Sequence, residues 1–182
     1  MAAVAMVAGL LLSGCGSSQV RHSLGPPISA TRAVSLFRAG LIALNGHLSK
    51  KAVADLSRSI ALDPSNVDAQ YDLGIAQTSL GHTSDAVAAY RKAIVLDPAF
   101  EPALFNLADL LTVAAPGDAI TLFKRLEQIH PKDAKVEFNL GLLLEAQGQL
   151  QAGEVQLKKA LAADRSLGTR LPPGTQLAPS ST

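Results

Sequence analysis

The side chains best suited to chemistry are one thiol and four imidazoles, because thiolates and imidazoles act as nucleophiles, bases and metal ligands near neutral pH. A lone cysteine excludes a disulfide framework and a cysteine-based zinc site within the chain. No H-E-x-x-H or G-x-S-x-G segment occurs, and no phosphate-cradling glycine loop is present. We therefore expect no catalytic residue, no metal site, no cofactor and no small-molecule substrate, and we predict that the protein is not an enzyme. The histidines are expected to be exposed residues of the N-terminal segment or of turns: His22, His47, His82 and His130.

The thiol stands at the end of an apolar segment. Residues 1–12 carry no charge and are followed by Ser13, Gly14 and Cys15. About a dozen residues cannot cross a bilayer of roughly 30 Å as a helix, but they match the apolar core of a secretory signal. The alternative is a buried N-terminal helix with an inert thiol.

The Leu-Ser-Gly-Cys segment at residues 12–15 resembles the bacterial lipobox. The resemblance implies a signal peptide at residues 1–14, cleavage before Cys15, and attachment of fatty acyl chains such as palmitate to that residue. Lipobox signals normally carry Lys or Arg before the apolar run; none stands there, and an upstream start would supply it. Several acyl chains anchor a protein stably, so we expect an exported protein anchored by lipid to a bacterial membrane. Gly16 is not the Asp that holds such proteins in the inner membrane, which implies the outer membrane, facing the periplasm, where two membranes exist.

A repeat of about 34 residues follows a Ser-, Gly- and Pro-rich segment, residues 15–31, which predicts a lipidated flexible tether. Small residues recur at this spacing as Ala52, Ala86 and Ala119. Such a period predicts stacked supersecondary units, and the Ala- and Leu-rich composition favours helices. Two further motifs recur: Leu62-Asp63-Pro64 as Leu96-Asp97-Pro98, and Tyr71-Asp72-Leu73-Gly74 as Phe105-Asn106-Leu107-Ala108 and Phe138-Asn139-Leu140-Gly141.

These motifs resemble the tetratricopeptide repeat. The resemblance implies an all-α, right-handed solenoid of about four helix-turn-helix units within residues 32–164, with the units at 33–66, 67–100, 101–133 and 134–164. The Trp of the family pattern is replaced in each unit, by Leu36, Gln70, Leu104 and Glu137. Three Pro and two Gly without helical period predict a disordered tail at 165–182.

In this family the first helix of each unit faces a concave groove. The resemblance therefore places an aromatic ladder there, flanked by aliphatic residues, and aromatic rings suit an anchoring role. The alternative is that the rings serve only to pack neighbouring first helices. The predicted protein-binding groove consists of Phe37, Leu41, Tyr71, Ile75, Phe105, Asn106, Phe138 and Leu142.

Two classes of partner are disfavoured. With 16 Lys and Arg against 15 Asp and Glu, the net charge of +1 argues against a nucleic-acid binder. Of the places that match the family's carboxylate clamp for acidic tails, only Asn106 carries a suitable residue. An apolar or amphipathic peptide is the more natural ligand.

The sequence thus predicts a membrane-anchored adaptor or scaffold that binds a protein segment of an envelope or secretion component, in cell-envelope assembly. The alternative is a permanent structural subunit of an envelope complex, in which the groove has no peptide-binding function. A third hypothesis, an accessory lipid or glycan hydrolase, has no residue pattern in its favour.

Overall fold

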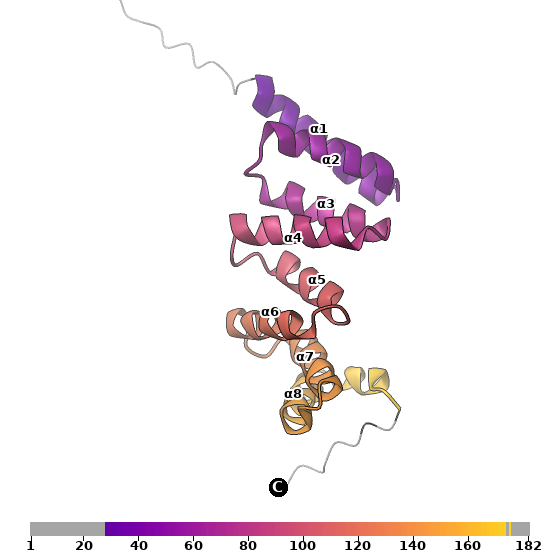
Figure 1. Cartoon of the computed structure of the whole chain (residues 1–182), viewed down its shortest axis with the longest axis vertical. Helices are drawn as coiled ribbons and strands as arrows, with labels where there is room; N and C mark the ends of the chain where they lie inside the picture. Colours follow the sequence, from indigo (N-terminus) through magenta and orange to yellow (C-terminus); the bar gives the residue numbers. More distant parts are fainter. Residues whose placement is uncertain (1–27, 174, 176–182) are drawn as a thin grey trace, which may run out of the picture.

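The computed structural model describes residues 28–173 and 175. This part of the chain forms helices in successive pairs, stacked along the long axis of the molecule (Figure 1). Each helix packs mainly against the helices before and after it in sequence. The elements are α1 (Ile28–Asn45), α2 (Ser49–Leu62), α3 (Val67–Ser79), α4 (Thr83–Leu96), α5 (Glu101–Leu111), α6 (Pro116–Ile129), α7 (Ala134–Ala146), α8 (Leu150–Ala163) and the 3₁₀ helix η1 (Arg165–Arg170). The predicted all-α solenoid of about four helix pairs is confirmed.

Close packing within each pair depends on matched small and large residues. A Cβ on Gly40 would lie 2.6 Å from Cγ of Leu56, and one on Gly141 would lie 2.8 Å from Cγ of Leu157. The missing Cβ lets the second helix of the pair press its large side chain against the first. The recurring Ala52, Ala86 and Ala119 are fully buried, as helix-contact positions require.

The connections are fixed by side-chain oxygens that accept backbone hydrogen bonds. Between pairs, Asp63 accepts from the Ser65 amide at 3.1 Å, and Asp97 accepts from the Ala99 amide at 2.9 Å. At the start of α7, the Asp133 carboxylate accepts from the Lys135 and Val136 amides, an N-cap. Asp63 and Asp97 are thus helix-end residues.

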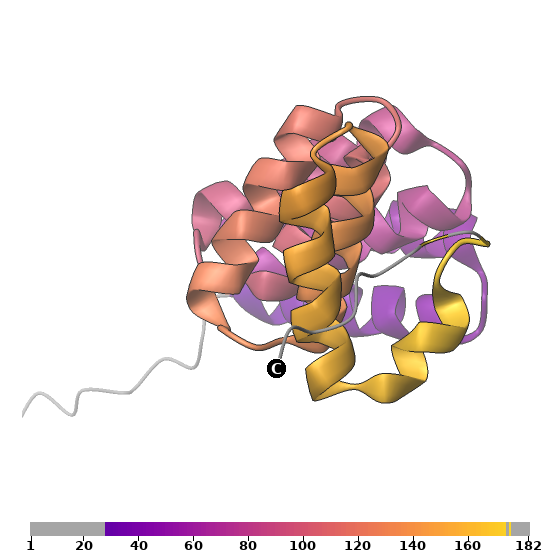
Figure 2. The ribbon, with the colours of Figure 1, turned by 90° about the horizontal axis from the view of Figure 1, so that it is seen from below.

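Both ends of the helical array differ from the sequence prediction. Helix α1 begins at Ile28, four residues inside the predicted tether, and its first buried residue is Ala33. Residues 165–170, predicted to be a disordered tail, form η1. Within the described residues no helix pair follows α8, and the chain folds back to bury Leu167 against Phe138, Leu157 and Ala160. Figure 2, viewed along the stack, shows η1 to one side of α8.

Cys15, the predicted signal peptide and the predicted tether before Ile28 lie outside the described residues. Within residues 28–173 and 175, none of the helices combines the length and hydropathy needed to cross a bilayer.

Candidate functional site

The predicted groove residues lie on the first helices of the pairs, α1, α3, α5 and α7, at positions equivalent by the repeat register. We call this row the inner face. Seven of the eight are half-buried, with part of each side chain open to solvent: Phe37, Leu41, Tyr71, Ile75, Phe105, Asn106 and Leu142.

Phe138 departs from this pattern, and its placement in an open groove was wrong. The ring is only 2% exposed, because Leu167 of η1 packs into the same cluster. The Arg170 guanidinium lies over the ring, with its Cζ 5.5 Å from the ring centroid. The accessible aromatic row therefore consists of Phe37, Tyr71 and Phe105.

Contacts of the inner-face side chains lie both within one unit and between neighbouring units. Asn106 Nδ2 of α5 donates a hydrogen bond to Tyr71 Oη of α3, over 3.3 Å. The Tyr71 ring also meets Phe100 edge-on, with ring centroids 5.4 Å apart, and Phe105 meets Phe123 at 5.7 Å. These rings are partly packing residues, as the alternative interpretation holds, and partly accessible surface.

A cavity of about 260 Å³ opens between α3 and α5. Ile75 and Asn106 of the predicted groove line it together with Thr78, Tyr90 and Asp109. Thr78 Oγ1 and Tyr90 Oη are 3.3 Å apart, so a hydroxyl pair stands at its wall. The structure therefore brings Ile75 and Asn106 together around one small, mixed polar and apolar hollow, and Tyr71 is joined to it through its hydrogen bond with Asn106.

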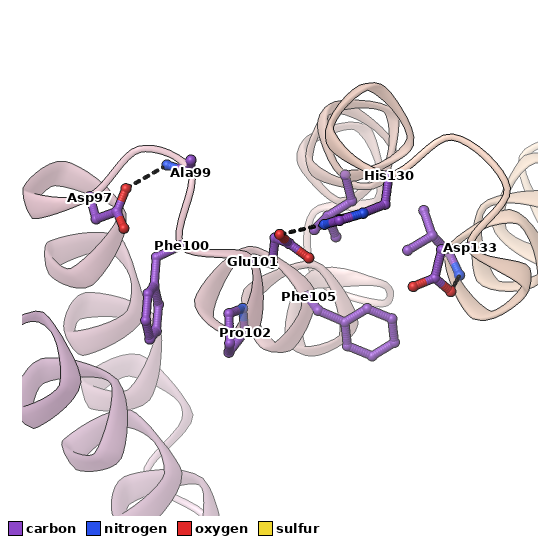
Figure 3. A pocket seen from close by; sticks show the side chains of 10 residues that line it. Asp97, Ala99, Phe100, Glu101, Pro102, Phe105, His130 and Asp133 are labelled. Carbon is purple, nitrogen blue, oxygen red and sulfur yellow. Dashed lines mark hydrogen bonds and ion pairs between the residues drawn. The ribbon is translucent and has the colours of Figure 1, made fainter.

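A larger cavity of about 520 Å³ lies between the beginnings of α5 and α7, and Figure 3 shows it from close by. Phe105 is the one predicted groove residue that lines it. At its rim, His130 Nε2 and Glu101 Oε1 are 2.6 Å apart, and both side chains are largely exposed, so the pair contributes little to stability. His130 is an exposed turn residue, as expected, but nothing in the sequence pointed to its partner.

Asp72 is a groove-row residue that sequence reasoning did not select for the site. It occupies in α3 the position that Asn106 occupies in α5 and Asn139 in α7, which is the signal that could have revealed it. The residue as a whole is 9% exposed, and burial, followed by the nearby Asp68 carboxylate, raises its pKa to about 6. Burial also raises the pKa of Tyr71 and of Tyr90, and Asp72 contributes to both shifts.

A third cavity, of about 370 Å³, lies on the outer side of the stack between α4 and α6. Its lining is mainly apolar and includes Ile94, Val95 and Leu122. Neither this hollow nor the inner face contains a metal-binding arrangement: among the described residues, no three His, Cys, Asp or Glu side chains cluster suitably.

A family model matches part of this chain, and solved structures of the same fold match most of it. Residues 37–100 match a tetratricopeptide repeat family model. Comparison with curated protein sequences gives no match.

Several solved structures share the architecture. MamA from Desulfovibrio magneticus RS-1 is 22% identical with a TM-score of 0.70, over 74% of this chain and 76% of that one. YrrB, described as a TPR protein with an unusual peptide-binding site, is 19% identical with a TM-score of 0.67, over 73% of this chain and 69% of that one. The first TPR of Spaghetti (RPAP3), bound to the HSP90 peptide SRMEEVD, is 15% identical with a TM-score of 0.61, over 65% of this chain and 95% of that one. At such identities the likeness concerns the fold alone.

Proposed function

We propose that this chain, a tetratricopeptide repeat protein, is a non-enzymatic adaptor that binds a protein segment on its inner face. The observation that carries the proposal is the hollow between α3 and α5, which the half-exposed Ile75 and Asn106 line, with the half-exposed Tyr71 hydrogen-bonded to Asn106. Two structures of the same fold are described as having a peptide-binding site or a bound peptide, which supports this use of the fold. Repeats of this kind generally act as interaction modules rather than as enzymes.

The bound segment is apolar or amphipathic. Accessible rings and aliphatic side chains supply contact area at low cost in side-chain entropy. An acidic chain end is a poor fit, because Asp72 and Asp109 put negative charge into the centre of the row and the clamp positions lack Lys and Arg.

We further propose that acyl chains on Cys15 anchor the protein to an exported membrane face, the outer membrane where two exist, in cell-envelope assembly. The lipobox resemblance supports this. Anchoring would concentrate the inner face near envelope partners, so that a modest affinity suffices for capture.

The test of binding is crosslinking on intact cells, followed by mass spectrometry of the captured proteins. The combined variant Phe37→Ser and Phe105→Ser is expected to lose the partners of the native protein. The combined variant Val95→Ser and Val155→Ser, on exposed surface of α4 and α8, is the matched control and should keep them.

Because the two rings also pack against the core, circular dichroism must show that each variant stays helical. Ile75→Lys gives a second, gentler variant, since a lysine keeps an aliphatic stem against the core while placing a charge in the hollow. Undiminished capture by both inner-face variants would contradict the proposal and favour the alternative, a permanent structural subunit with no groove function. Loss of capture in the α4 and α8 control alone would assign binding to the outer side.

The anchor is tested by Cys15→Ser with lipid labelling. The variant is expected to stay unlabelled and to be uncleaved or released from membranes. Labelling equal to that of the native protein would refute the lipobox assignment while leaving the adaptor role intact.

A further inference from the structure

Glu137 of α7 is a buried carboxyl group that the repeat does not require. Its register equivalents in the earlier units are Leu36, Gln70 and Leu104, and Leu104 is fully buried. Glu137 is only 4% exposed, its Oε2 has no hydrogen-bond partner, and the side chain makes no ion pair among the described residues. A buried carboxylate without a partner costs free energy. Such departures from the stabilising choice are expected at binding sites.

The Glu137 side chain forms part of the wall of a cavity of about 470 Å³ at the junction of α6, α7 and α8. Glu127 of α6 and Lys159 of α8 line the same cavity, and their Oε1 and Nζ atoms form an ion pair over 3.0 Å. None of the lining residues belongs to the inner face, so this cavity is separate from the site proposed above. Its apolar walls include Pro131, Ala162 and Ala163.

The groups around this cavity lack a hydrogen-bond donor rather than an acceptor. Gln156 Nε2 donates to Glu127 Oε1 over 3.1 Å, but Gln156 Oε1 is buried without a partner. In the described part of the chain, the buried side-chain atoms without a partner are this oxygen and Glu137 Oε2, and both are acceptors. Burial raises the pKa of Glu137 although the Lys159 charge lowers it, so Lys159 offsets the burial only in part. Lys132 also lines the cavity, but it is exposed and is therefore hydrated.

We propose that this cavity binds the side chain of an arginine from a protein partner. The guanidinium pairs with the Glu137 carboxylate, and its five N–H groups point in several directions, which suits acceptors carried by two helices. A guanidinium is also less strongly hydrated than an ammonium group, so it enters a partly apolar cavity at lower cost. The apolar walls offer contact to the aliphatic stem. The inference goes beyond the inner face, because it assigns the chain a second contact point for a partner.

The test is an NMR titration of the isotope-labelled full chain, at pH 7.5 and low salt, with the N-acetylated amides of arginine, citrulline and glutamate. Citrulline has nearly the shape of arginine but carries a neutral urea group in place of the guanidinium. The backbone amide signals of Lys132, Ala162 and Ala163 report on the cavity. We expect the arginine derivative to shift these signals at millimolar concentration. The citrulline derivative should bind about tenfold more weakly, and the glutamate derivative should bind least.

Glu137→Gln removes the charge of this side chain and keeps its shape. It is expected to lower the affinity for the arginine derivative to that for the citrulline derivative. Asp85→Asn, at an exposed position of α4 outside the cavity, also removes one negative charge and should leave both affinities unchanged. Circular dichroism verifies that each variant stays helical.

Lys132→Asn keeps the inference testable if Glu137→Gln does not fold. Asn tolerates the φ of 83° that residue 132 adopts, so this variant should fold normally. The change removes a positive charge that repels the incoming guanidinium. We expect the arginine derivative to bind about twofold more tightly, as the loss of an exposed charge allows. An unchanged or lower affinity would contradict the inference.

The outcomes separate this inference from the proposed function. Equal affinity for the arginine and citrulline derivatives, no shift of the cavity signals, or an arginine preference that survives in Glu137→Gln would overturn the arginine site. The adaptor role would then stand, because it is tested on the inner face. The Phe37→Ser and Phe105→Ser variant should bind the arginine derivative as the native protein does. Loss of that binding in the folded variant would move the arginine contact to the inner face and overturn the inference.

Discussion

Gly74 of α3 lies directly against the ring of Tyr90 in α4, so that a Cβ on Gly74 would stand 2.4 Å from Tyr90 Cε1. The ring is held from its other end, because the Tyr90 hydroxyl lies 3.3 Å from Thr78 Oγ1. The same ring forms part of the wall of the hollow between α3 and α5. One contact therefore sets both the spacing of the second helix pair and the shape of the candidate site.

Gly74→Ala should destabilise the protein, because the added methyl group must displace a ring that cannot move freely. The gain in helix propensity, about 1 kcal/mol, offsets part of an overpacking cost of about 1–3 kcal/mol. Urea unfolding followed by circular dichroism measures the difference. Gly117→Ala is the control, since no atom lies within 4 Å of a Cβ there, and it should be neutral or stabilising. Equal effects of the two changes would contradict the close contact with Tyr90.

Leu167→Ala should loosen the last helix pair, because it removes the apolar side chain with which η1 covers Phe138. Truncating a buried leucine costs about 2–5 kcal/mol. In a stack of units that contact only their neighbours, the loss should be local. Hydrogen exchange is expected to accelerate in α7 and α8 and to stay unchanged in α1 and α2. Leu150→Ala, at an exposed position of α8, should have almost no effect; a comparable acceleration there would show that η1 has no special role.

Glu137→Leu should stabilise the protein. The side chain is 4% exposed, its Oε2 has no hydrogen-bond partner, and burial raises its pKa. Leu104 fills the equivalent position of α5 and is fully buried. Lys159 keeps its ion pair with Glu127, 3.0 Å away, so the substitution leaves the Lys159 ammonium group paired. We expect a gain of about 1–3 kcal/mol in the free energy of unfolding. A decrease in the free energy of unfolding would mean that the Glu137 carboxylate has a binding partner in solution. Gln151→Leu, at an exposed position of α8, serves as the control.

Asp72 should make stability depend on pH. Its pKa is about 6 in the folded protein and 3.8 for the free side chain, so between these values the folded state holds a proton that the unfolded state has lost. The contribution of this group to stability therefore falls as pH rises from about 4 to 6 and is constant above. The nearby Asp68 carboxylate contributes to this raised pKa, and burial also raises the pKa of the neighbouring Tyr71 and Tyr90.

Asp72→Asn removes this dependence. Its advantage over the native protein should be greatest at pH 7.5, about 1–2 kcal/mol once water at the groove rim has screened the charge, and should shrink toward pH 4. Urea titrations at several pH values measure it. An advantage that grew on acidification would contradict the raised pKa.

The sequence could predict which helices carry the candidate-site residues, but not the exposure of those residues or the charge around them. The register placed Tyr71, Ile75 and Asn106 on the same row, because a period of about 34 residues fixes equivalent positions on equivalent helices. It could not show that η1 covers Phe138, since that contact depends on how the segment after α8 folds back onto α7. The burial of Asp72 and the approach of Glu101 to His130 likewise depend on how neighbouring helices meet.

The sequence by itself determined that the chain is a stack of helix pairs, because the small and large residues that pack each pair recur within a short stretch of chain. Those contacts join residues that are close in sequence, so they leave a pattern that can be recognised in the sequence alone. The tertiary structure alone decided that η1 covers the last helix pair, which rings stay accessible and which carboxyl side chains become largely buried. These properties arise from side chains of different units that meet only when the stack is complete.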